Sequence, residues 1–267
     1  MNTATLQRLF GIEGKIAVVT DSGRNSSVDV APLLAEAGAT VVVADKVSVD
    51  VQAVVAKITS AGGKAVGIAT DVENEAAVVA LFAQVTATHG SPDIVVNCAA
   101  MNNNGPITAF TGAAWDEVMS VDLKSVFFCM REAIRHMQVA GRGGRIVNIT
   151  TMGALHAVLN GNGAYSAARA GVSGLVRACA LDYAPDRILI NCVMPGAVPG
   201  KVRFHPDTET RMQTGLLTGP GTDVERRRPL GWGNSQDIAA AVLYLVGPSG
   251  GYMTGQSIVL DGGFLVS

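Results

Sequence analysis

A tyrosine and an arginine four residues apart are the first candidates for acid–base chemistry in this sequence. Tyr165 and Arg169 fall on one predicted helix, where this spacing places both side chains on the same face. A phenol beside a fixed cation has a lowered pKa and can donate or accept a proton. Most tyrosine–arginine pairs at this spacing have no catalytic role, so the pair alone does not predict an activity.

A second candidate is the turn over residues 20–27, which follows the first apolar segment. A dinucleotide-binding turn needs glycines there, because the backbone must approach a diphosphate at the start of a helix. This turn contains one glycine, Gly23, and places Asp21 close to the end of the predicted strand. Judged by its residues, the turn is a poor phosphate site.

Asp45 follows the second apolar segment directly. A carboxylate at that place binds both adenosine ribose hydroxyls of NAD and repels the 2′-phosphate of NADP. The residue therefore favours NAD over NADP if either dinucleotide binds. A solvated aspartate at the end of a strand explains it equally well, and both interpretations stay open here.

Short apolar segments that alternate with helical patterns must position these side chains. The segments are continuous apolar runs, which are typical of parallel strands covered by helices on both faces. Expected strands cover residues 16–20, 40–44, 65–69, 94–97, 145–149, 188–193 and 257–260. Expected helices cover residues 28–37, 49–61, 74–89, 113–138, 165–183 and 237–246. This order predicts an α/β fold with a doubly wound parallel sheet in a single domain, residues 1–267.

The composition excludes several classes of protein. The 267 residues are 48% hydrophobic and 16% charged, with a formal net charge of −2. Such a chain lacks the basic surface that nucleic acids require and the high charge content of disordered proteins. No apolar run reaches the ~18 residues of a membrane span, and residues 1–10 lack the pattern of a signal peptide. We therefore expect a cytoplasmic protein that binds neither nucleic acid nor membrane.

The cysteines and histidines do not indicate a metal site. Cys98, Cys129, Cys179 and Cys192 each lie in an apolar run and form no CxxC pair, so we expect reduced, buried thiols. The four histidines show no ligand spacing, and no metal is assigned.

Residues 196–234 have the least regular pattern and are rich in glycine, proline and charge. A loop of this length is usually functional, and we expect a substrate lid there. It contains the arginine run 226–228. A solvated charged segment is favoured for this run over a clamp for an anion.

Six short segments form an ordered series of motifs over nearly the whole chain. They are TDV at 70–72, VNCAA at 96–100, RIVNITT at 145–151, YSAAR at 165–169, PG at 195–196, and a tail from TGQ at 254–256 to DGG at 261–263. In order and spacing, the series resembles the short-chain dehydrogenase/reductase family. The resemblance implies a seven-stranded Rossmann sheet, usually a tetramer, and hydride transfer between a nicotinamide and an alcohol or ketone.

The resemblance also implies roles for individual residues. The cofactor-binding positions would be Asp45, Asp71, Val72, Asn97, Pro195 and Gly196. The catalytic positions would be Asp122, Thr151, Tyr165 and Arg169.

Several of these positions depart from the family pattern. Asp21, Asn25 and Ser27 replace the three glycines of the phosphate turn, Asp122 replaces an asparagine, Thr151 a serine and Arg169 a lysine. Threonine keeps the hydroxyl, but a planar guanidinium cannot reproduce the point charge of an ammonium that binds ribose hydroxyls and passes protons onward. Asp122 adds a negative charge that can pair with Arg169, and Asp21 would repel a phosphate.

The departures concentrate at nucleotide and proton-relay positions, while the scaffold motifs stay intact. The preferred hypothesis is therefore a degenerate family member, the non-catalytic partner of an intact subunit in a hetero-oligomeric NAD-dependent alcohol dehydrogenase. Resemblance to such assemblies implies a small-molecule or 3-hydroxyacyl-CoA-type substrate, with NAD, if any, as the cofactor. One alternative is an active NAD(H)-dependent alcohol dehydrogenase or ketoreductase that uses Tyr165, Thr151 and Arg169. Another is a binding module that holds a different ligand in the former cofactor and substrate pocket.

The helices expected over 113–138 and 165–183 should form the main interface of a tetramer, with a second subunit or with copies of this chain. Small side chains in the second helix allow close packing of helices, and in a monomer they would form an exposed apolar patch. These residues are Ala167, Ala168, Ala170, Gly171, Gly174 and Ala178.

Overall fold

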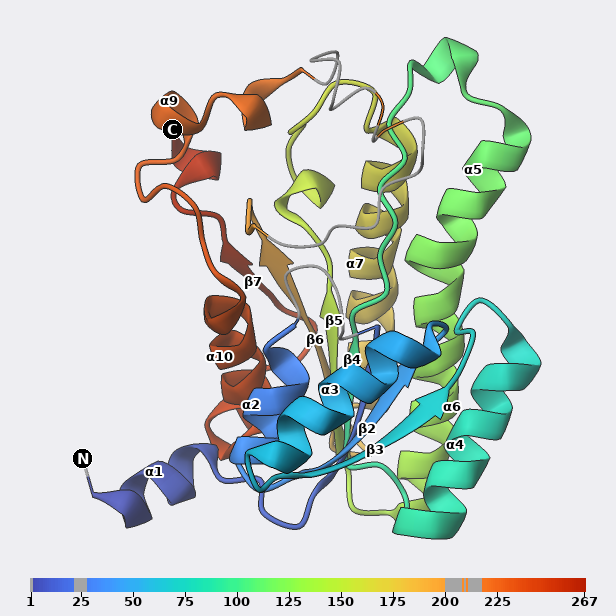
Figure 1. The fold of residues 1–267 in the computed structure, drawn as a ribbon, viewed down its shortest axis with the longest axis vertical. Coiled ribbons are helices and arrows are strands. Elements are labelled where there is room, and N and C mark those ends of the chain that lie inside the picture. Colours follow the sequence, from blue (N-terminus) through green and yellow to red (C-terminus); the bar gives the residue numbers. More distant parts are fainter. Residues whose placement is uncertain (1, 22–27, 200–207, 209, 211–217) are drawn as a thin grey trace.

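The computed structural model describes residues 2–21, 28–199, 208, 210 and 218–267, and these form one α/β unit (Figure 1). Its strands are β1 (Ile16–Thr20), β2 (Thr40–Asp45), β3 (Lys64–Ala69), β4 (Ile94–Asn97), β5 (Gly144–Ile149), β6 (Ile188–Pro195) and β7 (Ser257–Leu260). Its α-helices are α1 (Thr3–Phe10), α2 (Val30–Glu36), α3 (Ser48–Ser60), α4 (Glu75–His89), α5 (Gly112–Met119), α6 (Ser125–Ala140), α7 (Gly163–Tyr183), α9 (Val224–Arg227) and α10 (Ser235–Val246).

The seven strands form one parallel sheet in the order β3-β2-β1-β4-β5-β6-β7. This confirms the predicted doubly wound Rossmann sheet. The register sets Thr20 at the end of β1 opposite Ala44 of β2 and Asn97 of β4. The carboxyl ends of the central strands therefore meet at one edge, where ligands bind in this class of fold.

Helices cover both faces of the sheet, which explains the continuous apolar runs. One layer packs α2, α3 and α10 against residues such as Val19 and Val43. The other packs α4, α6 and α7 against Val18 and Val42. Neighbouring residues of one strand thus face opposite layers, and both are buried.

Two features differ from the sequence prediction. Helix α1 was not expected; Asn2 caps it by accepting a hydrogen bond from the amide of Thr5, and none of its side chains is buried. The helix expected over 113–138 is divided by a π-helical turn, Ser120–Lys124, between α5 and α6. Such turns frequently occur at functional sites, and this one contains Asp122.

Of the four cysteines, Cys98, Cys129 and Cys192 are buried as expected, while Cys179 is half-buried; none forms a disulfide. Burial raises the pKa of Cys129 to about 12 and that of Cys192 to about 11. Within the described residues, no helix is both long and apolar enough to span a membrane.

Candidate functional site

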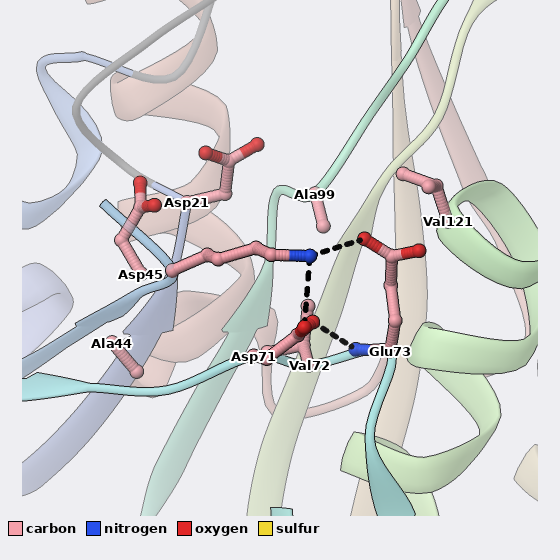
Figure 2. A pocket seen from close by; sticks show the side chains of 9 residues that line it. Asp21, Ala44, Asp45, Asp71, Val72, Glu73, Ala99 and Val121 are labelled. Atoms are coloured by element: carbon pink, nitrogen blue, oxygen red, sulfur yellow. Dashed lines mark hydrogen bonds and ion pairs between the residues drawn. The ribbon is translucent and has the colours of Figure 1, made fainter. Parts of the chain in front are cut away.

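The carboxyl ends of β1, β2 and β3 enclose a pocket that brings together several predicted site residues. Asp45, Asp71 and Val72 line it, as does Asp21 from the phosphate turn (Figure 2). Asn25 and Ser27, the other two altered positions of that turn, lie outside the described residues.

Asp45 suits a ribose at this edge. Its side chain is 5% exposed, and its Oδ1 accepts a hydrogen bond from the amide of Val47 at 2.8 Å. Its Oδ2 is buried without a hydrogen-bond partner. A buried acceptor of this kind is costly unless a donor reaches it, and a ribose hydroxyl is such a donor. The adenosine end of the dinucleotide that the resemblance implies therefore fits.

Two lining residues were missed by the sequence reasoning. Lys46 Nζ lies 2.8 Å from Asp71 Oδ2 and 3.7 Å from Glu73 Oε1 (Figure 2). Asp71 also accepts a hydrogen bond from the amide of Glu73 at 3.1 Å. The only sequence signal for these two residues is their position: Lys46 follows Asp45 directly, and Glu73 lies two residues after Asp71. Among the described residues, the pocket lining thus contains four carboxylates, counting Asp21, and one ammonium, a balance unfavourable to an anionic ligand.

The diphosphate end does not fit. Asp21 adopts a φ of 49°, in the left-handed region that glycine occupies most easily. Its amide donates to the carbonyl of Ala44 at 2.8 Å, which places the residue directly at the end of the sheet. A carboxylate stands where a glycine would let the backbone approach phosphate oxygens. The residues that are described therefore accommodate adenosine but not the diphosphate of NAD.

Arg169 and Asp122 form an ion pair in the protein interior. Both side chains are fully buried, and Arg169 Nη2 lies 2.6 Å from Asp122 Oδ1. Arg169 also donates to the carbonyl of Ala99 at 2.6 Å and to that of Ile149 at 3.4 Å. Asp122 in turn accepts a hydrogen bond from the amide of Met101 at 3.1 Å. The guanidinium is thus held by the protein itself and cannot act as a solvent-accessible proton carrier.

The electrostatics of Tyr165 differ from the sequence expectation. Arg169 lies 5.4 Å from the centre of the Tyr165 ring. Burial raises the pKa of Tyr165, Arg169 lowers it by less, and the net pKa lies above its ordinary value. Burial lowers the pKa of Arg169, but Asp122 and Tyr165 more than compensate, so Arg169 stays charged. At neutral pH the phenol is therefore protonated and is a weak base.

Thr151 lies two residues after the end of β5, and its hydroxyl oxygen takes part in a hydrogen bond with the neighbouring backbone. Its Oγ1 accepts a hydrogen bond from the amide of Gly153 at 3.1 Å, which caps a short 3-10 turn, Met152–Ala154. The hydroxyl proton is still available to a substrate oxygen. Thr151 thus keeps a hydroxyl at the position of the family's serine.

Asn97 belongs to a row of buried amides across three strands. Asn97 Nδ2 donates to Asn148 Oδ1 at 2.8 Å, and Asn148 Nδ2 donates to the carbonyl of Asn191 at 3.4 Å. Asn191 continues the row to the segment before β7, since its Nδ2 donates to the carbonyl of Met253 at 2.8 Å. We call Asn97, Asn148 and Asn191 the amide row. Asn97 therefore has a structural role in addition to any contact with a cofactor.

Pro195 is the last residue of β6, and the backbone of Gly196, the next residue, packs closely against the backbone of Asp261. A Cβ on Gly196 would lie 2.7 Å from the Cα of Asp261, so glycine is required for this approach. The Gly196 amide donates to the carbonyl of Leu260 at 2.8 Å.

The proposed lid, 196–234, is described at 196–199, 208, 210 and 218–234. In the described part of the chain, no His, Cys, Asp and Glu side chains gather in a group that could hold a metal ion.

Known proteins match nearly the whole length of this chain. A model of the enoyl-(acyl carrier protein) reductase family matches residues 27–265. The chain is 34% identical over 257 residues to the (2S)-[(R)-hydroxy(phenyl)methyl]succinyl-CoA dehydrogenase subunit BbsD of Thauera aromatica, covering 95% of this chain and 98% of that one. It is 34% identical over 253 residues to cis-4-hydroxycyclohexanecarboxylate dehydrogenase of Sinomonas cyclohexanicum, a match that covers 94% of this chain and 96% of that one.

Solved structures show the same fold. A dehydrogenase/reductase from Sinorhizobium meliloti superposes with a TM-score of 0.85 at 32% identity, covering 98% of this chain and 99% of that one. A short-chain type dehydrogenase/reductase from Mycobacterium marinum superposes with a TM-score of 0.89 at 28% identity, and the match covers 98% of this chain and 100% of that one.

Proposed function

Because this chain belongs to the short-chain dehydrogenase/reductase family of NAD(P)-dependent oxidoreductases, we propose that it is the non-catalytic subunit of a hetero-oligomeric NAD-dependent alcohol dehydrogenase. In this assembly an intact family member transfers the hydride. The present chain supplies the fold and the contact surface, and it binds NAD weakly or not at all.

The observation that carries this proposal is the buried pair of Arg169 and Asp122. The family's lysine at position 169 would have to reach a ribose and exchange protons. Arg169 is instead fully buried, with its N–H groups directed to a carboxylate and two carbonyls. Moving it toward a ligand would leave the buried charge of Asp122 uncompensated, which costs several kcal/mol.

The acidic pocket supports the same proposal independently. Asp21 occupies the phosphate turn, and the pocket carries an excess of negative charge beside it. Loss of the proton relay and loss of the phosphate site are two separate defects, and either would slow hydride transfer in this chain.

A relative supports the choice of partner and substrate class. The Thauera aromatica protein is named as one subunit of a dehydrogenase whose substrate is an acyl-CoA. We propose that this chain is the second, non-catalytic subunit in a two-subunit dehydrogenase like that of benzylsuccinyl-CoA oxidation. We therefore assign this chain an intact family member as partner, in a tetramer, and a 3-hydroxyacyl-CoA-type substrate for the assembly.

One observation favours the alternative, an active NAD(H)-dependent alcohol dehydrogenase or ketoreductase. Asp45 keeps a buried oxygen that a ribose hydroxyl would satisfy. Tyr165 keeps its proton and Thr151 its hydroxyl, so an acid and a substrate-binding group are both present. In that case Arg169 would position Tyr165 rather than relay protons.

Replacing Tyr165 with phenylalanine distinguishes the two functions. In the native assembly we expect Tyr165→Phe to change the rate by less than twofold, because this subunit transfers no hydride. The measurement is steady-state NADH formation by the assembly, purified through a tag on this chain. The same replacement at the equivalent tyrosine of the partner is the positive control. A loss of more than tenfold, about 1.4 kcal/mol in the barrier, would support the enzyme instead.

The exposed face of α7 predicts the subunit interface. Ala167, Ala170 and Ala178 are exposed, whereas Ala168 packs into the core. A Cβ built on Gly174 meets no atom closer than Arg177 Nη2 at 4.0 Å, so a larger side chain fits within the single chain. Further along the helix, Leu181 is 79% exposed. An apolar face of this kind is unusual for a monomer.

We expect Gly174→Glu to release species smaller than the wild-type assembly, because the carboxylate would be buried at a helix–helix contact. Size-exclusion chromatography with light scattering measures the mass. Ala56→Glu, on the exposed side of α3, is the matched control and should leave the mass unchanged. A folded Gly174→Glu variant at the wild-type mass would show that Gly174 lies outside the interface.

A further inference from the structure

The arginine run 226–228 is not a uniformly solvated segment. Arg226 is exposed, but Arg228 is 4% exposed although it carries a full charge. Arg228 directly follows α9, which lies on the side of the sheet to which the carboxyl ends of the strands point (Figure 1). The predicted solvated charge run therefore does not describe this residue.

The guanidinium of Arg228 is incompletely satisfied. Its Nη2 donates to the carbonyl of Gly221, whereas its Nε and Nη1 are buried without a hydrogen-bond partner. None of the ion pairs between described residues involves Arg226, Arg227 or Arg228. A buried cation without a counter-charge is strongly unfavourable, so the position requires an external acceptor.

The surroundings hold this cation in a fixed place. The Arg228 guanidinium lies 4.4 Å from the centre of the Trp232 ring, and the indole itself is 55% exposed. On the other side, Gly221 is fixed because its amide donates to the carbonyl of Val158 at 2.7 Å. The backbone around Arg228 is fixed as well, since the amide of Leu230 donates to the carbonyl of Gly262 at 3.2 Å.

Arg227, the preceding residue of the chain, has a second guanidinium with an unused N–H group. The Arg227 guanidinium lies 4.9 Å from the centre of the Phe264 ring, and its Nε is also buried without a partner. His156 contributes a ring nitrogen 3.5 Å from Arg227 Nη2. The two guanidiniums contact different side chains, Phe264 and His156 for Arg227 and Trp232 for Arg228, so only Arg228 is placed beside Trp232.

We propose that Arg228, with the ring of Trp232, forms a binding site for an oxyanion. A carboxylate or a phosphate group would bring both the missing negative charge and acceptor oxygens for the unused N–H groups. The site is built from residues outside the Asp45–Asp71 pocket and outside the Arg169–Asp122 pair. It operates whether or not this chain transfers hydride, so its test is separate from that of the proposed function.

Fluorescence of Trp232 reports on this site. The sequence has two tryptophans, and Trp115→Phe leaves Trp232 as the single emitter. In this background, the full-length chain is titrated with succinate, inorganic phosphate and the uncharged succinamide. We expect a saturable change in emission with succinate or phosphate and none with succinamide. A tenfold preference for one anion assigns the group as a carboxylate or a phosphate.

Two variants locate the binding. Arg228→Gln should weaken anion binding at least tenfold, whereas Arg226→Gln, a neighbouring exposed arginine, should change it less than twofold. An equal response to succinamide, or equal losses in both variants, would overturn the proposal.

A second readout does not depend on the folding of Arg228→Gln. Succinate or phosphate should raise the melting temperature of the unaltered chain, while sodium chloride at matched ionic strength should not. The same shift with sodium chloride would exclude a specific site.

Discussion

Replacement of Asp122 by alanine is expected to destabilise the folded chain by about 3–5 kcal/mol, a large part of the 5–15 kcal/mol that stabilises a typical domain. The reason is Arg169, which is fully buried and pairs with Asp122 at 2.6 Å. Without the carboxylate, the guanidinium keeps its charge in the interior with two carbonyl acceptors. The Met101 amide also loses its acceptor.

Urea unfolding followed by circular dichroism measures this loss as a lower midpoint at an unchanged slope. The double variant Asp122→Leu, Arg169→Met is the informative control, because it removes both charges. We expect it to recover most of the lost stability, since buried ion pairs are often replaced by apolar residues without loss. Equal destabilisation in the single and double variants would show that the two charges are not coupled.

Removal of the Asp21 charge is expected to raise the affinity for NADH on the order of a hundredfold. A carboxylate ~5 Å from a phosphate charge costs roughly 3 kcal/mol at an effective dielectric constant near 20. Asp21→Asn removes that charge, and asparagine tolerates the left-handed φ of 49° that this position requires. Asp21→Gly should bind at least as well, because glycine adopts this backbone without strain.

Isothermal titration calorimetry of the purified chain with NADH measures this gain against a wild type that binds weakly or not at all. Asp116→Asn, which removes an exposed carboxylate on α5, is the matched control and should leave the affinity unchanged. NADPH should bind less well than NADH, because Asp45 lies where a 2′-phosphate would be placed. Micromolar binding by the wild type would contradict the proposed loss of the cofactor site.

The fold was predictable because its central strands, β1, β2, β4, β5 and β6, are buried on both faces. Runs such as 16–20 and 40–44 have no polar alternation, and this property is specific to a sheet covered by two helical layers. Helix α1 escaped prediction because it is short and buries none of its residues, although its sequence is amphipathic. The π-helical turn at Ser120–Lys124 was also missed, since it depends on tertiary packing rather than on helical propensity.

The candidate site was predictable where a residue follows a strand. Asp45 and Asp71 end at the same sheet edge, and the structure places both in one pocket. Lys46 was not predictable, because its ion pair with Asp71 joins segments that are distant in sequence. The burial of Arg228 was not predictable, because a run of arginines does not show which of them is enclosed. The raised pKa of Tyr165 was missed for a similar reason: sequence spacing shows a neighbouring cation but not the extent of burial.

The Arg169–Asp122 pair has a consequence for evolution. A return to the lysine and asparagine of active relatives requires two substitutions, and each one alone creates a worse intermediate. Asp122→Asn leaves the buried guanidinium without a counter-charge. Arg169→Lys removes the planar guanidinium, whose two terminal nitrogens contact Asp122, Ala99 and Ile149 at the same time. Selection for stability would remove either intermediate before catalysis could reappear. If this chain is the non-catalytic subunit proposed above, the pair makes a return to the family's lysine and asparagine difficult.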